Sequence, residues 1–535
     1  MIASRLLRTA LLVICLGVVL FGSVSSASGQ VLDDVIRYSQ RFPAPSGPVM
    51  GTAGAGLMAG REELGTLVGN PAGLGWMSTS MVGGDFAAQR ARNNSRFLTP
   101  DDNATAERTA SDYRLGRLGG AYVFPTEQGS AVIGVAYHQI NTYERGFDVA
   151  GTNASNSITP TFLPSSAGFS AEEVEEDGVY NLAFDRVRSR IAYDAGAIRF
   201  SSSDFEGGNF PFAEAATPGG GQTIQQQDDV FESGQMNEIN IGGAVEVAPG
   251  VMVGGGLNIA FGSYRFERFY RETDLRSVNS RSQLNDTYSP DGTDLEGFKE
   301  LRFERRIDTD LSGANFRMGV SAELTDGLRS GLLIESPTWY SVTEVFGARI
   351  ETAFDCNGQG CDPNGVPGLS SGSLTGNEFE YRLQTPWRIG AGLQYTQSGL
   401  MIAADVEFVD WTQTSVTADN ESFSELNREI RALDATVNAS AGIEYAFDQV
   451  AVRGGAAYRP DARGESFSDV NGESTDRNRL FFSAGVSYTP TETFALHLNW
   501  LQERVDDQSA SYDGGPSIRE QLQRNRFVLG MTFRF

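Results

Sequence analysis

The sequence predicts an all-β protein, a transmembrane antiparallel β-barrel of about 14 strands with a small N-terminal plug. Three observations favour this class. Apolar and polar residues alternate with period two along segments long enough to cross a bilayer. Short turns and long polar loops alternate between those segments. Hydrophobic residues make up only 40% of the chain while Gly is abundant, at 62 residues, as expected where every second strand residue faces water.

The N-terminus holds the one long apolar run of the chain. Arg5 and Arg8 precede the apolar residues 11–21, and small residues follow. This order is typical of a cleaved secretory signal peptide, which we assign to residues 1–29. The run is shorter than the roughly 20 residues that a spanning helix needs, which disfavours a membrane anchor. Cys15 lies in the middle of the run, where it does not fit a lipoprotein signal.

Residues 30–78 precede the first predicted strand and are rich in Gly and Ala. The stretch 31–42 has an amphipathic pattern that predicts a short helix. Gly54, Gly56 and Ala59 form a GxGxxA pattern like that of dinucleotide-binding folds, but no strand precedes it. We interpret the segment as a compact plug inside the barrel, because Gly and Ala permit close approach of backbones.

The barrel is predicted for residues 79–535, and its last strand shows the pattern most clearly. In 524–535, aromatic and aliphatic residues fall on one face, and Arg526 and Arg534 fall on the other. The first face suits lipid, whereas the arginines need water. The same alternation recurs in thirteen upstream segments: 79–88, 115–124, 130–144, 237–248, 250–266, 301–325, 328–352, 376–397, 399–415, 435–447, 449–459, 479–489 and 493–506.

The connections support the same topology. Short turns, such as 447–449, separate long polar loops that include 145–236, 267–300 and 353–375. Short periplasmic turns and long extracellular loops are typical of outer-membrane barrels, so we expect the protein in the bacterial outer membrane. A secreted β-sandwich or propeller would have no reason to alternate in this way. The first of these loops contains a predicted helix near 181–191.

Two cysteines, Cys356 and Cys361, lie together in the loop 353–375. In an oxidising compartment such a pair is expected to form a disulfide, and no nearby His supports zinc. We therefore expect no metal site. Binding of calcium stays open as an alternative, through the oxygen ligands of Asp355, Asn357, Asp362 and Asn364.

Charge and histidine content limit the functions that the chain can have. A net charge of −26 excludes nucleic acid as an expected partner, and leaves outer-membrane lipid and lipopolysaccharide. His138 and His497 are the only histidines. A phospholipase site would need His497 beside Ser483 or Ser487. Lumen-facing polar residues explain these side chains more simply, so we expect no enzyme and no cofactor.

The motif Asn70-Pro71-Ala72, followed by Gly73 and Leu74, gives the chain a specific resemblance. It is similar to the NPA motif in the N-terminal hatch of the FadL/TodX family of outer-membrane transport proteins. Asn caps and Pro stiffens such a turn. Further likeness lies at Thr385-Pro386-Trp387-Arg388, at Ala404-Asp405-Val406, at Asp410-Trp411 and at Arg453-Gly454-Gly455.

The resemblance implies passive uptake of a hydrophobic small molecule, typically a long-chain fatty acid or an aromatic hydrocarbon. Such a ligand would enter a plugged barrel, shift the hatch and leave sideways through the wall. A carboxylate head group would want an arginine, and alternation points Arg388 and Arg453 into the lumen. Asp405 and Glu407 also point inward and can neutralise them. A ligand site and a structural charge network are therefore alternatives.

Members of this fold family also serve as partner-binding components of protein secretion, such as the shuttle protein of the type IX system. Long acidic loops would suit that role, so secretion components remain alternative partners. A structural surface barrel is a third reading. The loop 145–236 departs from the family pattern in its length, which puts the shape of an outer entry site in doubt.

Overall fold

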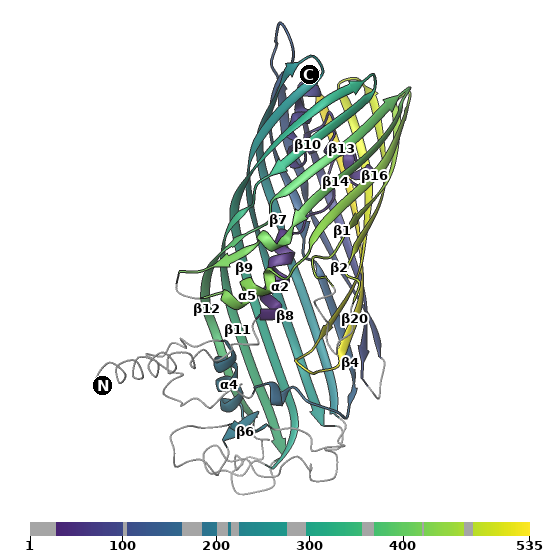
Figure 1. Cartoon of the computed structure of the whole chain (residues 1–535). Coiled ribbons are helices and arrows are strands. Elements are labelled where there is room, and N and C mark those ends of the chain that lie inside the picture. Colours follow the sequence, from purple (N-terminus) through teal and green to yellow (C-terminus); the bar gives the residue numbers. More distant parts are fainter. Residues whose placement is uncertain are drawn as a thin grey trace, which may run out of the picture.

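The protein is a single closed antiparallel barrel of 14 strands, described by a computed structural model (Figure 1). No helix among the described residues is both long and apolar enough to span a membrane. The structure describes residues 28–99, 104–162, 184–200, 212–215, 224–274, 296–355, 369–419, 422–464 and 475–535.

In the described part of the chain, the wall consists of 18 strand segments. Four barrel strands contribute two segments each, which gives 18 − 4 = 14 strands. The divided strands are β3 with β4, β10 with β11, β12 with β13, and β14 with β15. The segments are β1 (Met81–Leu98), β2 (Thr105–Val123), β3 (Ala131–Thr142), β4 (Arg145–Asn153), β7 (Ile224–Ala248), β8 (Val251–Asp274), β9 (Glu296–Thr325), β10 (Leu328–Glu335), β11 (Trp339–Asp355), β12 (Leu369–Gln384), β13 (Arg388–Gln397), β14 (Leu400–Asp410), β15 (Ser415–Thr417), β16 (Ala435–Phe447), β17 (Val450–Arg459), β18 (Arg479–Thr491), β19 (Phe494–Ala510) and β20 (Ser517–Arg534).

Two of the interruptions contain a proline. Pro337 separates β10 from β11, and Pro386 separates β12 from β13. Proline has no N–H to donate to the ladder, so the strand bends where the proline stands. The interruption between β3 and β4 has no proline and consists of Tyr143 and Glu144.

The first and last strands close the barrel. β1 pairs with β20 without a register shift from Met81 opposite Arg534 to Leu98 opposite Ser517. The predicted faces of β20 are confirmed, because Phe527 is 50% exposed on the outside whereas Val528 is fully buried on the inside. The prediction of about 14 antiparallel strands is therefore confirmed.

An apolar band surrounds the half of the barrel that ends in the short turns. On β9, Phe316, Met318 and Val320 point outward and are exposed, whereas the outward Arg302 and Arg306 follow nearer the long loops. An exposed apolar belt on a closed barrel meets lipid, so the protein spans the outer membrane, with the short turns in the periplasm. The charged part of the wall extends beyond the membrane, toward the bottom of Figure 1.

The strands reach much further into the predicted loops than alternation suggested. The predicted loop 145–236 contains β4 and the first residues of β7, and 267–300 contains the end of β8 and the start of β9. The loop 353–375 likewise contains the end of β11 and the start of β12. Apart from Phe269 on β8, the outward residues of these extensions are mostly polar, so the extensions carry no regular hydrophobic alternation.

Helical elements lie inside the barrel and at its outer mouth. They are α2 (Ser28–Ser39), α4 (Phe184–Asp194), α5 (Ser424–Ile430) and the 3-10 turns η1 (Pro48–Thr52), η2 (Leu64–Val68), η3 (Pro71–Trp76), η4 (Thr159–Phe162) and η5 (Trp411–Gln413). A short hairpin of β5 (Ile198–Phe200) and β6 (Phe212–Ala215) stands apart from the barrel sheet. α4 packs on β11 and β12 within the predicted loop, close to the helix expected near 181–191.

Candidate functional site

The lumen is filled by residues 28–80, which are drawn in purple in Figure 1. Most side chains of this segment are buried against inward-facing barrel residues. Glycines in the wall make room for its backbone. A Cβ on Gly331 would lie 1.8 Å from the Met58 carbonyl oxygen, and one on Gly455 would lie 2.3 Å from the Thr52 carbonyl carbon. The segment therefore fits the lumen closely, whereas its role as a closing plug stays a prediction.

Asn70 connects this segment to two barrel strands. Its side-chain amide lies 2.8 Å from the Met58 carbonyl oxygen, 3.0 Å from that of Val320 and 3.3 Å from that of Leu332. Its side-chain oxygen accepts from the Ala72 N–H at 3.1 Å, which caps the turn that Pro71 begins. The predicted hatch motif Asn70-Pro71-Ala72 is thus fully buried against β9 and β10.

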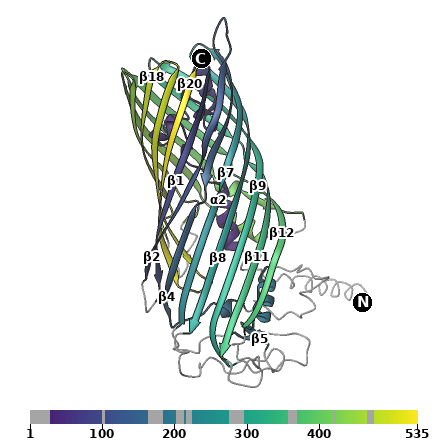
Figure 2. The same cartoon turned by 180° about the vertical axis from the view of Figure 1, so that it is seen from behind.

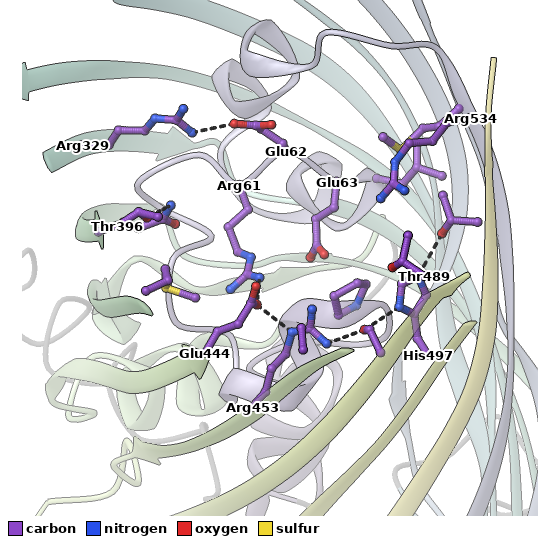
Figure 3. A pocket seen from close by; sticks show the side chains of 18 of the residues that line it. Arg61, Glu62, Glu63, Arg329, Thr396, Glu444, Arg453, Thr489, His497 and Arg534 are labelled. Carbon is purple, nitrogen blue, oxygen red and sulfur yellow. Dashed lines mark hydrogen bonds and ion pairs between the residues drawn. The ribbon is translucent and has the colours of Figure 1, made fainter. Parts of the chain in front are cut away.

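Arg453 lies at the periplasmic end of the lumen in a shared ion pair. Its guanidinium is 2.7 Å from Glu444, and the same carboxylate is 2.7 Å from Arg61 of the N-terminal segment. Figure 3 shows these three side chains in line beside a cavity of about 540 Å³. Glu63 and His497 also line this cavity, so it is polar rather than a site for an acyl chain.

Arg388 and Glu407 form a second ion pair, with 2.9 Å between them. Asn438 donates to the same carboxylate at 2.8 Å, and Arg388 donates to the Ser39 carbonyl oxygen at the end of α2 at 2.5 Å. Among the described residues, no arginine forms an ion pair with Asp405. Its carboxylate instead accepts the backbone N–H of Met58 at 3.1 Å.

All four predicted lumen charges thus point inward, and the structure gives each of them a protein partner. Arg388 and Asp405 bind the N-terminal segment directly, and Arg453 reaches it through Glu444. Glu407 holds Arg388 in place. Whether any of them also binds a ligand stays a prediction.

One buried ion cluster could not be found from the sequence. Arg41 of the N-terminal segment lies 2.6 Å from Glu335, and Arg317 lies 2.8 Å from Glu335 and 2.9 Å from Glu238. For Glu238, Arg317 and Glu335, the period-two alternation of the sequence indicates only that these side chains point into the lumen. Nothing in the sequence indicates that Arg41 meets them, because that contact depends on the path of the segment through the lumen.

A cluster of buried apolar side chains occupies the lumen beyond the ion cluster, and α2 is packed inside it; we call the space that α2 fills the apolar chamber. Leu32, Val35 and Ile36 of the helix are buried in it. The polar side of α2 carries Asp34, and burial raises the pKa of that carboxyl to about 7 although Arg37 beside it opposes the rise. The chamber is lined by Tyr143, Tyr264, Leu311, Tyr340, Val342, Tyr381, Leu383, Val409 and Trp411 from the wall and by Leu426 and Ile430 from α5.

The barrel wall is incomplete next to this chamber. Pairing of β2 with β3 ends at Arg117 opposite His138, and β4 pairs with β7 but with no other described strand. β4 lies against the inner side of β1, where Gly146 accepts a hydrogen bond from the Asn93 side chain at 3.1 Å. The edge of β2 that faces away from β1 therefore has no backbone partner from residue 105 to 116 among the described strands.

Ion pairs span this wall gap in place of a ladder. Arg114 on β2 lies 3.2 Å from Glu144 at the bend, and Arg108 pairs with Asp229 of β7. Tyr143 at the bend packs edge-on against Tyr38 of α2, with 6.1 Å between ring centroids. The helix in the chamber and the bend at the gap are thus in direct contact.

The described parts of the connection between β4 and β7 contact the outer ends of β8, β11 and β12. Thr352 of β11 donates to the Ala195 carbonyl oxygen just after α4. Glu272 of β8 accepts from the Ile158 N–H at 2.8 Å and from the Ser157 hydroxyl at 2.5 Å. These contacts hold the described part of the connection inside the barrel rim.

The enzymatic alternative is only partly assembled. Ser487 lies 2.7 Å from Nδ1 of His497, as a nucleophile and base would. The other ring nitrogen faces the Thr532 hydroxyl at 3.2 Å, where a triad would place a carboxylate. Ser483 donates instead to the Gly51 carbonyl oxygen at 3.0 Å. The cysteine pair Cys356 and Cys361 and the calcium candidates at 357, 362 and 364 lie outside the described residues.

Comparison with known proteins supports the same architecture. No family model and no curated relative matches the sequence. The structure of a FadL homologue from Pseudomonas aeruginosa aligns over 93% of this chain and 100% of its own length, with a TM-score of 0.51 and 12% identity. The chain has the FadL fold.

Two further structures with lower scores also align. The toluene transporter TodX of Pseudomonas putida covers 91% of this chain and 97% of its own, with a TM-score of 0.45 and 11% identity. The monoaromatic hydrocarbon channel CymD covers 92% and 97%, with a TM-score of 0.44 and 11% identity. The alignment with the FadL homologue confirms the FadL fold predicted from Asn70-Pro71-Ala72 and the strand count.

Proposed function

We propose that this barrel is an outer-membrane channel for hydrophobic small molecules and that long-chain fatty acids are its substrate. The observation that carries the proposal is the apolar chamber in the lumen. A water-filled pore offers an apolar solute no favourable path, whereas a chamber lined by tyrosine, tryptophan and aliphatic side chains does. The FadL fold supports an outer-membrane channel for hydrophobic compounds.

Helix α2 acts in this proposal as an internal competitor of the ligand. Its apolar face, with Leu32, Val35 and Ile36, occupies the chamber. Burial of apolar surface contributes about 25 cal/mol per Å², for a helix as for an acyl chain. A fatty acid can therefore replace α2 without leaving the chamber exposed to water, and the displaced helix would clear the lumen.

The wall gap offers the exit. Tyr38 leaves the chamber with α2 and removes its contact with Tyr143 at the bend. The ion pair of Arg114 with Glu144 still connects the bend to β2, but this edge of β2 has no ladder that must break before the bend moves away. A ligand released there enters the membrane sideways, which keeps its acyl chain out of the polar cavity at the periplasmic end.

Uptake of a labelled long-chain fatty acid tests the proposal, in cells with and without this protein at matched barrel levels. We expect uptake that follows the protein and is competed by unlabelled fatty acid. Leu311→Gln places a polar group in the chamber and should reduce uptake about tenfold. An unpaired buried amide costs about 1–3 kcal/mol, and about 1.4 kcal/mol corresponds to a factor of ten. The outward neighbour Asp310→Asn is the matched control, because Asp310 is exposed.

Equal uptake with and without the barrel would refute the fatty-acid proposal. Co-purification then separates the remaining candidates. A bound aromatic or other apolar compound would keep the channel and change its substrate. Bound secretion subunits would support the partner-binding alternative, for which the described residues provide no specific observation.

A further inference from the structure

Arg526 of β20 has a buried guanidinium group whose hydrogen-bonding capacity is largely unused. The residue points into the lumen and is 2% exposed. Its Nη1 donates to the side-chain oxygen of Gln139 on β3 at 2.7 Å. Nε and Nη2 are also buried, and neither has an acceptor among the described residues. Buried N–H groups of a charged side chain are costly to leave unpaired, so this arrangement indicates a site that awaits an acceptor.

The carboxylates around Arg526 are bound to other arginines. Asp85 of β1 pairs with Arg117 at 2.9 Å, and Asp112 of β2 pairs with Arg114. Both acids attract Arg526 through space, but neither forms a hydrogen bond or an ion pair with it in the described part of the chain. The positive charge of Arg526 therefore lacks a carboxylate in contact with it.

The guanidinium group lies where the wall gap begins, on the side of the barrel where Figure 2 labels β1, β2 and β4. The ladder between β2 and β3 ends with Arg117 opposite His138, so Gly116 and Gln139 are the first residues beyond it on the two strands. Arg526 donates to Gln139, and its Nη2 lies 3.6 Å from the place that a Cβ on Gly116 would take. Because Gly116 has no side chain, nothing at that position shields the guanidinium group from the gap.

The N-terminal segment covers the same group from the lumen. The backbone N–H of Phe42 donates to the Ile140 carbonyl oxygen of β3 at 3.0 Å, which fixes the segment beside the gap. The ring of Phe42 lies 4.9 Å from Cζ of Arg526. A cation–π contact of this kind stabilises the charge but leaves the N–H groups unused. Since α2 ends at Ser39, only three residues before Phe42, displacement of α2 would draw this cover away.

The depth of Arg526 in the membrane follows from the outward residues next to it. Phe527 pairs with Trp500 of β19 and with Ala88 of β1, and Ala88 pairs with Tyr113 of β2. The next outward positions toward the long loops are polar on all four strands. Such a row of aromatic side chains is typical of the boundary between acyl chains and head groups. Arg526 therefore lies at the level of the head groups of the outer leaflet.

We propose that Arg526 binds the carboxylate of the fatty acid while the ligand passes the wall gap, an inference that rests on the proposed function. Nε and Nη2 lie on the same edge of a guanidinium group, and together they donate two parallel hydrogen bonds to one carboxylate. The ligand that displaces α2 also uncovers this edge. A carboxylate held here lies at the depth of the head groups, so its acyl chain can turn into the apolar part of the outer leaflet.

Uptake of a labelled long-chain fatty acid and of the alcohol of equal length tests this site, in cells with the full barrel and after subtraction of uptake by cells without it. Arg526→Gln should lower uptake of the acid about tenfold and leave that of the alcohol unchanged, since hydrogen bonds between charged groups contribute about that factor or more. Arg526→Lys keeps the charge but not the paired donors, so it should lose less. The matched control is Arg524→Gln. Arg524 points into the lumen from the same strand but pairs with Glu503 at 3.0 Å, so this variant should change both uptakes by the same factor.

Thermal unfolding separates this role from a structural one. A buried charge without a carboxylate partner does not stabilise the barrel, so Arg526→Gln should unfold at or above the temperature of the wild type. If a buried water molecule were the natural partner of Nε and Nη2, the variant would affect acid and alcohol alike. Equal changes in both uptakes, or a clearly lower unfolding temperature, would overturn the inference and leave the proposed function intact. No uptake of either compound by the wild-type barrel would instead refute the proposed function, and the inference with it.

Discussion

At the scale of single residues, the N-terminal segment is held by polar contacts whose strength does not depend on ligand. Asn70 makes several of these contacts, since its side-chain amide donates to the carbonyl oxygens of Met58, Val320 and Leu332. A hydrogen bond of this kind contributes about 1 kcal/mol net, and more is lost when a buried carbonyl is left without a donor. The motif that resembles the family hatch is thus a fastening between segment and wall.

Asn70→Asp should loosen the segment, because a carboxylate repels the three carbonyl oxygens that the amide binds. We expect docking of the segment to weaken by about 2–4 kcal/mol and single-channel conductance to rise. Thermal unfolding should change little, since the wall ladders remain. Asn94→Asp, on the exposed outer face, is the control. Conductance equal to that of the wild type would show that Asn70 does not fasten the segment.

A substitution of Arg388 distinguishes the two interpretations of the lumen charges, a ligand site and a structural charge network. Because it binds the carbonyl at the C-terminal end of α2, Arg388→Ala should release the helix and raise conductance without ligand. Affinity for a fatty acid and for the alcohol of equal length should then change by the same factor. A loss of about tenfold for the fatty acid alone would instead identify Arg388 as its carboxylate partner.

At the scale of elements, the bend between β3 and β4 is the feature that makes this wall unusual. Gly234 of β7 lies opposite the bend, and its carbonyl oxygen accepts from the Tyr143 N–H at 3.0 Å. It has φ 127°, and a Cβ there would lie 2.1 Å from the Ser263 carbonyl oxygen. A glycine is therefore needed for β7 to stay on β8 while its other neighbour turns inward.

Gly234→Ala should disturb the bend through both its positive φ and the clash with β8. We expect the free energy of unfolding to fall by about 2 kcal/mol or more and fatty-acid uptake to fall with it. Gly376→Ala is a matched control, since Gly376 has φ 78° and no atom within 4 Å of the added carbon. That variant should lose only about 1 kcal/mol. Equal effects of the two substitutions would remove the bend as the cause.

At the scale of the whole molecule, the sequence predicts the membrane-spanning barrel well. It does not predict the outer halves of the strands, the apolar chamber in the lumen or the wall gap. Period-two alternation persists only where one face meets lipid, which is why the fourteen strands could be counted. On the outer half of β1, Arg90 and Arg92 point outward while Gln89 and Asn93 point inward, so both faces are polar and the predicted strand 79–88 ends before them. The chamber and the wall gap depend on long-range contacts that no local pattern reports.

Deletion of residues 31–78 tests whether the segment in the lumen closes the channel. The wall ladders do not depend on this segment, so the truncated barrel should fold and run as a heat-modifiable band. It loses the ion pairs of Arg41 with Glu335 and of Arg61 with Glu444, and it exposes the apolar chamber. We expect a large, steady conductance in planar bilayers, where the full chain gives little. If the correctly folded truncated barrel conducted no current, the barrier would instead lie at the outer mouth. Thr352 and Glu272 would still hold α4 and the other described parts of the β4–β7 connection there.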